Sequence, residues 1–160
     1  MKESIPHFPG SIPSLRRRHR PQLNQAIIQQ GGLSEHHLTL LPQPGESAAS
    51  MLERLAHLLQ AHNASVVRHE VFGALAAQPE FAFAQQKLFG EQAWPVTWVE
   101  GASCAGSSLA GMHVLAVAGT RVESLSAGGR VVGRIFNDGH ARHCLLGDLR
   151  PTDPRASRDQ

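Results

Sequence analysis

The chain has 160 residues, of which 41% are hydrophobic, so it is long enough for one domain with its own core and too short for two. Its 15 Lys and Arg against 13 Asp and Glu give a net charge of +2, and the run RRRHR at residues 16–20 carries much of the excess. This distribution does not indicate a basic binding face over the whole domain. No apolar stretch approaches the roughly 18 residues that span a bilayer, so we expect a cytoplasmic protein with no membrane partner.

Residues 1–32 are predicted to form a proline-rich, basic N-terminal arm. Prolines at positions 6, 9, 13 and 21 disfavour a long helix or a central strand. The arginine run is interpreted as a solvated segment. Contact with RNA through Arg16, Arg17 and Arg18 is possible but not favoured, because no aromatic residues are interleaved with them.

Residues 33–150 are predicted to form the folded domain, and residues 151–160 a polar tail. A strand is expected from His36 up to Pro42, followed by a helix that starts after Gly45 and stops near Asn63. A β-branched strand is expected over residues 65–73. A shorter helix, with a proline in its first turn, then runs to Gly90.

The remainder of the domain is predicted to be strands and turns. Strands are expected at VTWVEG, LAGMHVLAVAG and RVESLS, and a β-hairpin over residues 130–149 with its turn at Asn137-Asp138-Gly139. This order predicts an α+β domain: a mixed sheet with two helices packed on one face, plus a C-terminal β-hairpin. The second face of the sheet is predicted to be apolar and must be buried, and self-association is the simplest way to bury it.

The octapeptide WPVTWVEG, residues 94–101, contains both tryptophans of the chain. The two-residue period of a strand places Val96, Trp98 and Glu100 on one face and Thr97 and Val99 on the other. We predict a central strand at a subunit interface.

Several of these segments resemble the YjgF/Rid superfamily, also known as the endoribonuclease L-PSP-like or reactive-intermediate deaminase proteins. They are the helix-and-strand run ESAASMLERLAHLLQAHNASVVRHEVFG, WPVTWVEG and LAGMHVLAVAG. WPVTWVEG, LAGMHVLAVAG and the C-terminal GRVVGRIFNDGHARHCLLGDLRP are similar to the chorismatase branch in particular. The resemblance covers roughly residues 36–150. It implies a chorismate-mutase-like fold, a homotrimer whose sheets form a central barrel, and ligand clefts between subunits.

The chain departs from this family at the positions of its chemistry. Deaminating members hold the substrate carboxylate with an arginine, and the matching position here is Val96 or Thr97, depending on the alignment. The family's water-positioning glutamate corresponds to His113, and a cysteine near the cleft to Trp98 or Val99. These departures remove the usual basis for expecting an imine deaminase.

The candidate catalytic residues are therefore His113, as a general base, and Glu100, as the carboxylate that orients it. Val96, Trp98 and Cys104 are candidate ligand-binding residues, although a free loop thiol is the more ordinary role for Cys104. The histidines do not assemble a local ligand set, so no metal site is predicted. The glycine pairs match no phosphate or dinucleotide motif, so no cofactor is expected.

The function expected from these observations is a stand-alone YjgF/Rid/chorismatase-like homotrimer that binds a small carboxylated or aromatic metabolite between subunits. Whether it is an enzyme stays open at this point. One alternative is a hydrolase of the family type, either an enamine/imine deaminase or an endoribonuclease. The other is a structural trimer without catalysis.

Overall fold

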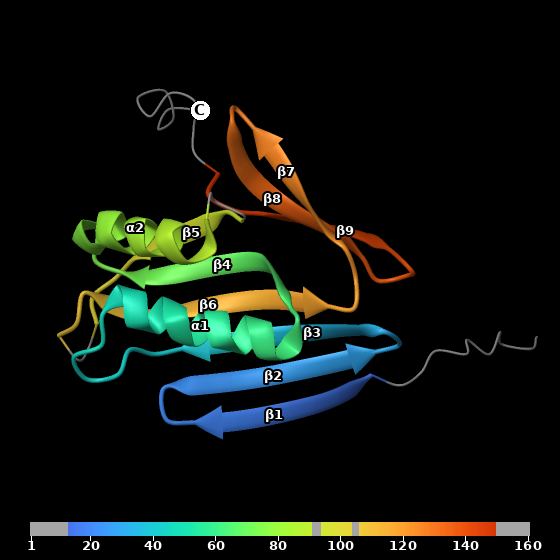
Figure 1. Ribbon diagram of the computed structural model, residues 1–160, viewed down its shortest axis with the longest axis horizontal. Helices are drawn as coiled ribbons and strands as arrows, with labels where there is room; N and C mark the ends of the chain where they lie inside the picture. The colour runs from blue at the N-terminus through green and yellow to red at the C-terminus, as the bar shows by residue number, and fades with distance from the viewer. Residues whose placement is uncertain (1–12, 91–93, 104–105, 150–160) are drawn as a thin grey trace, which may run out of the picture.

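The computed structural model describes residues 13–90, 94–103 and 106–149, and Figure 1 shows how their elements are arranged. The strands are β1 (Ser14–Arg20), β2 (Leu23–Gln30), β3 (Leu33–Leu40), β4 (Ser65–Gly73), β5 (Val96–Glu100), β6 (Leu109–Ala118), β7 (Val122–Ala127), β8 (Arg130–Asn137) and β9 (Arg142–Leu146). The helices are α1 (Ala48–His62), the short 3-10 helix η1 (Leu75–Ala77) and α2 (Gln78–Phe89).

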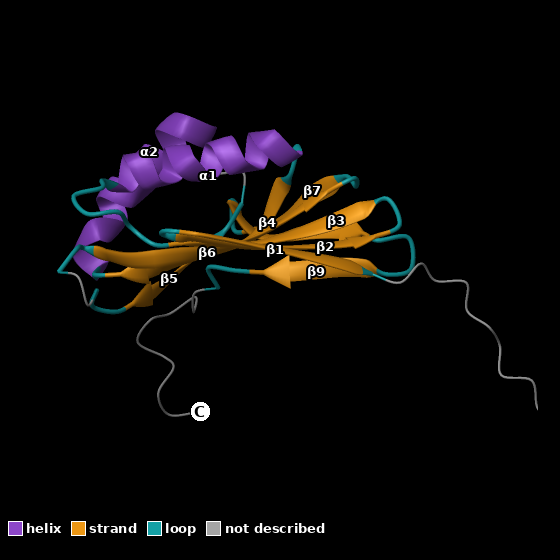
Figure 2. Cartoon of the chain, turned by 90° about the horizontal axis from the view of Figure 1, so that it is seen from below, coloured by secondary structure: helices purple, strands orange, loops and turns teal. Residues whose placement is uncertain are grey.

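Six strands form the main sheet, in the order β1-β2-β3-β6-β4-β5. All neighbouring pairs are antiparallel except β4 and β5, which run parallel, so the sheet is mixed. Both α-helices lie on one face of this sheet, as Figure 2 shows. The predicted α+β class, with two helices on one face of a mixed sheet, is confirmed.

The helix α1 has the boundaries that its sequence predicts. The Ser47 side chain accepts a hydrogen bond from the backbone N–H of Ser50 at the N-terminus, and Asn63 takes the left-handed conformation at the C-terminus. Its apolar stripe, including Met51, Leu52 and Leu55, is fully buried against the sheet. None of the described helices is long and apolar enough to cross a membrane.

The main difference from the sequence-based expectation lies in residues 14–30. The structure places them in the two strands β1 and β2 of the main sheet, where the sequence predicts part of an arm. Pro21 does not interrupt a strand, because it occupies the two-residue turn between β1 and β2 together with Gln22, whose φ is 58°. The arginine run is therefore an edge strand, with all seven residues of β1 exposed.

A second, three-stranded sheet contains the C-terminal strands. The predicted hairpin is present as β8 and β9, and β7 extends it on the other side in the order β7-β8-β9. In the turn, Asn137 accepts a hydrogen bond from the backbone of Gly139, whose φ is 90°. The C-terminal addition is thus larger by one strand than expected.

Two apolar clusters hold these parts together. The main core lies between the helices and the main sheet, and includes the buried residues Leu38, Leu55 and Val114. A smaller cluster of Val67, Val117 and Phe136 joins the far face of the main sheet to the second sheet. The second sheet therefore covers part of the face that carries no helix.

Candidate functional site

Six polar residues form a continuous row across the main sheet on the face without helices. In sheet order they are His19, Asn24, Thr39, His113, Glu70 and Thr97, and each is the direct register partner of the next. Their chain neighbours Leu38, Leu40, Met112, Val114 and Val71 are buried in the main core. Because side chains alternate along a strand, this polar row points away from the helices.

The centre of the polar row is a contact between a histidine and a carboxylate. His113 Nδ1 lies 3.3 Å from Glu70 Oε2, and the side chains are 34% and 19% exposed respectively. Arg68 donates from Nε to Glu70 Oε1 at 3.1 Å, and its terminal nitrogen makes a second contact with the same oxygen. The carboxylate is held by the guanidinium and in turn orients the imidazole ring, so that Nε2 of His113 is the ring nitrogen left for a ligand.

A second histidine–carboxylate pair lies beside the first. His37 Nε2 is 3.6 Å from Glu35 Oε2, and the rings of His37 and His113 have centroids 6.3 Å apart. Both pairs are on the face that carries the polar row, and both histidines are about one-third exposed. Two imidazoles therefore flank one patch of the sheet, each next to a carboxylate.

The structure does not bring Glu100 to His113. Glu100 is the register partner of Gly73 at the end of β4, whereas His113 faces Glu70, three positions earlier on that strand. The carboxylate that orients His113 is therefore Glu70, which the sequence analysis missed. A signal was present in SVVRHEVFG, where the two-residue period puts Arg68 and Glu70 on one face.

The other predicted ligand-binding residues divide between two environments. Val96 and Trp98 lie on the helix side and pack against the main core, and the Trp98 indole donates to the carbonyl of Gly73 at 3.2 Å. Thr97 between them belongs to the polar row instead. Because β5 is at the edge of the sheet, the prediction of a central strand is wrong. Cys104 lies outside the described residues.

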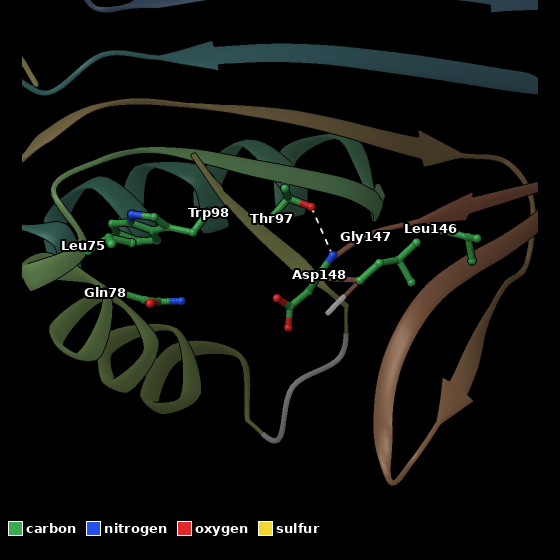
Figure 3. Close-up of a pocket in the computed structure, with 8 residues that line it drawn as sticks. Leu75, Gln78, Thr97, Trp98, Leu146, Gly147 and Asp148 are labelled. Atoms are coloured by element: carbon green, nitrogen blue, oxygen red, sulfur yellow. Dashed lines mark hydrogen bonds between the residues drawn. The ribbon is translucent and has the colours of Figure 1, made fainter. Parts of the chain in front are cut away.

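A cavity of about 480 Å³ wraps around this free edge of β5 (Figure 3). Its wall is made by η1, the start of α2, β5, the end of β9 and the segment that follows it, with Leu75, Gln78, Thr97, Trp98 and residues 146–149. The backbone N–H of Asp148 donates to Thr97 Oγ1 at 3.2 Å, and the Asp148 carboxylate accepts from Arg130 at 3.0 Å. Thr97 thus connects the polar row with the edge cavity.

Two further histidines, His69 and His36, are buried on the helix side. His69 is 1% exposed, and its Nδ1 accepts a hydrogen bond from the Trp94 indole at 3.2 Å. Burial, and secondarily the charge of His113, lowers the pKa of His69 to about 3. Burial also lowers the pKa of His36 to about 4, with help from His62 and His37. Both rings are neutral at physiological pH.

No protein-family model and no curated protein sequence matches this chain. Among solved structures, the chain is similar to one described as a "putative translation initiation inhibitor" from Salmonella typhimurium. The two share 14% sequence identity over 66% of this chain and 97% of that one, with a TM-score of 0.48. A likeness at this level assigns no function to the chain.

Proposed function

We propose that this chain is a stand-alone protein of the YjgF/Rid and chorismatase type, which binds a small carboxylated or aromatic metabolite on the face that carries the polar row. The observation that supports this most directly is the His113–Glu70 contact, because a half-buried imidazole held by a carboxylate has one ring nitrogen free for a ligand. The proposal places the ligand between copies of a homotrimer.

The surroundings of His113 suit a flat, carboxylated ligand. Leu115, two residues further along β6 on the same face, is partly buried and lies in register between His37 and Arg68. An apolar side chain with an imidazole on one side and a guanidinium on the other can support an aromatic ring while a carboxylate reaches one of these two groups. Arg68, half exposed, can supply here the charge that is missing at Val96 and Thr97.

The apolar surface next to the polar row supports self-association. Phe72 and Val99 are register partners on β4 and β5, two residues beyond Glu70 and Thr97, and they are 37% and 39% exposed. Neighbouring exposed apolar residues on a sheet face are typical of an interface. A second and third copy of the chain would cover them and complete a cleft at the polar row.

Sedimentation velocity is expected to give three times the 17.3 kDa mass of one chain. Phe72→Lys should shift the particle toward the monomer, because it would bury an unpaired charge in the interface. Phe83→Lys is the matched control, since Phe83 lies on α2 and is 71% exposed on the helix side. A monomeric wild-type protein at micromolar concentration would contradict the trimer.

Benzoate is a suitable probe for the ligand site, because it combines an aromatic ring with a carboxylate. In an NMR titration we expect the ring resonances of His113 and His37 to shift. His113→Asn should weaken benzoate binding about tenfold, which corresponds to one hydrogen bond to a charged group. The control is His57→Gln, on the exposed side of α1. Benzoate binding that is equal in both variants would place the ligand elsewhere.

The His113–Glu70 contact also favours a second candidate, the hydrolysis of an imine or enamine. A carboxylate at Nδ1 stabilises the imidazolium that forms when Nε2 takes a proton from water, as general-base catalysis requires. If His113 acts as this general base, the rate of 2-iminoacid hydrolysis should fall about 100-fold in His113→Ala. Glu70→Gln should lower the rate and also move its pH profile, which loss of stability alone would not do. Without acceleration by the wild-type protein, the hydrolase candidate fails while the binding proposal stands.

A further inference from the structure

A second cavity lies on the opposite side of the sheet, between the end of α1 and the strands β1, β2 and β3. Its volume is about 450 Å³, and its wall includes Arg16, Arg18, Ser34, His36 and His62. Figure 1 shows β1 and β2 at the sheet edge beside α1, with no helix drawn over them. This cavity, here called the arginine groove, is separated from the polar row by the thickness of the sheet.

The strand register explains why two of the arginines line this groove. Arg16 pairs with Ile27 and Arg18 with Gln25, and both of these partners are buried on the helix side. Arg17 lies between them in sequence and therefore points to the other face. The run RRRHR thus presents two guanidinium groups, two residues apart on one strand, to the same cavity.

One histidine in the wall of the groove has a buried ring nitrogen without a described partner. His36 is 3% exposed, its Nε2 lies 3.1 Å from the hydroxyl of Ser34, and its buried Nδ1 makes no hydrogen bond within the described residues. A neutral imidazole that accepts from Ser34 at Nε2 carries its proton on Nδ1. An N–H donor without a partner is costly to bury, so this ring has an unmet hydrogen-bonding demand beside the groove.

The neighbouring histidine adds a second donor. This histidine is His62, which is hydrogen-bonded to Gln25. The amide nitrogen of Gln25 lies 3.2 Å from His62 Nε2 and donates to it, so the proton of neutral His62 is on Nδ1. The rings of His36 and His62 are 4.6 Å apart. At the end of α1 the carbonyls of Leu59 and Gln60 already accept from the N–H groups of Asn63 and Ala64. These two carbonyls are already hydrogen-bonded within the helix end. The positive charges that line the groove belong to the side chains of Arg16 and Arg18.

We propose that the arginine groove binds the phosphate group of a small phosphate ester. Two guanidinium groups match the oxygens of a phosphate with paired, charge-assisted hydrogen bonds, and the rings of His36 and His62 form part of the wall beside them. This site is independent of the metabolite site proposed at the polar row. The competing explanation is that the arginines only protect an exposed sheet edge from pairing with other chains.

The test is a titration of the full chain with phenyl phosphate and with inorganic phosphate at pH 7.5, followed by calorimetry and by histidine NMR. We expect both to bind, and the ring signals of His36 and His62 to shift. Arg16→Gln/Arg18→Gln should weaken phenyl phosphate binding about tenfold or more. Arg17→Gln is the matched control, because it removes the same charge from the opposite face of the same strand, and it should change the affinity less than about twofold.

Crossed controls separate this site from the polar row. Arg16→Gln/Arg18→Gln should leave benzoate binding unchanged, and His113→Asn should leave the binding of inorganic phosphate unchanged. Circular dichroism of each variant establishes that β1 variants remain folded. The proposal is overturned if neither phosphate compound binds, if Arg17→Gln weakens binding as much as the double variant, or if a single-stranded RNA oligonucleotide binds with a steep salt dependence while phenyl phosphate does not.

Discussion

Acidification from pH 7 to pH 5 is expected to lower the free energy of unfolding by about 2 kcal/mol through His69 alone. In the unfolded chain this imidazole takes a proton near its ordinary pKa of 6.5, whereas in the folded protein its pKa is about 3. At pH values between about 3 and 6.5, His69 is protonated in the unfolded state and neutral in the folded state. Stability therefore rises with pH across this window and is lost as the pH falls.

His69→Gln isolates this contribution, because an amide oxygen can still accept from the Trp94 indole but does not titrate in this range. Urea unfolding at pH 7 and pH 5, at one fixed protein concentration, should show a loss about 2 kcal/mol smaller in the variant than in the wild type. Equal losses in the two proteins would mean that His69 is not held neutral by the fold. His36, with its pKa lowered to about 4, acts in the same direction and leaves a residual loss in the variant.

Gly119→Ala is expected to destabilise the protein by about 3 kcal/mol or more, or to prevent folding. Gly119 has φ 86°, and a Cβ built there would lie 2.0 Å from the carbonyl oxygen of Gly32. That oxygen belongs to the turn between β2 and β3, so the backbone of one of the two segments would have to move. The position follows β6, where the chain leaves the main sheet for the second one.

Gly129→Ala is the matched control for this substitution. Gly129 has φ 74°, but nothing lies within 4 Å of the position of its Cβ, so only the conformational cost of about 1–2 kcal/mol applies. The difference between the two variants in chemical denaturation measures the clash at Gly119. If both variants lose the same stability, the close approach to Gly32 does not constrain the fold.

The elements β3, α1, β4, α2 and β5 to β9 could be predicted from the sequence, because each carries a local signal. Ser47 and Asn63 mark the ends of α1, and Gly90 ends α2. The strands β1 and β2 could not be predicted in the same way. Pro21 and an exposed run of arginines are typical of a loop, and what makes β1 a strand is its pairing with β2, which is a tertiary property.

The candidate site was predictable only in part. His113 could be predicted as a site residue because it is titratable and lies in a segment whose sequence pattern indicates a strand. Its partner Glu70 depends on which positions of β4 and β6 face each other, and this register includes an irregularity between Val66 and Arg68. Glu100 shared a strand face with Trp98, but that face turned out to be the helix side of an edge strand.

The polar row also restricts how the strands of the main sheet can align. Sliding β6 by one residue would turn His113 toward the helices and place Met112 and Val114 in water. The same slip in β4 would turn Glu70 and Arg68 together into the apolar core and separate Glu70 from His113. The residues proposed to bind a ligand therefore also make misaligned versions of the sheet costly, so that selection for the site and selection for a unique fold would act on the same side chains.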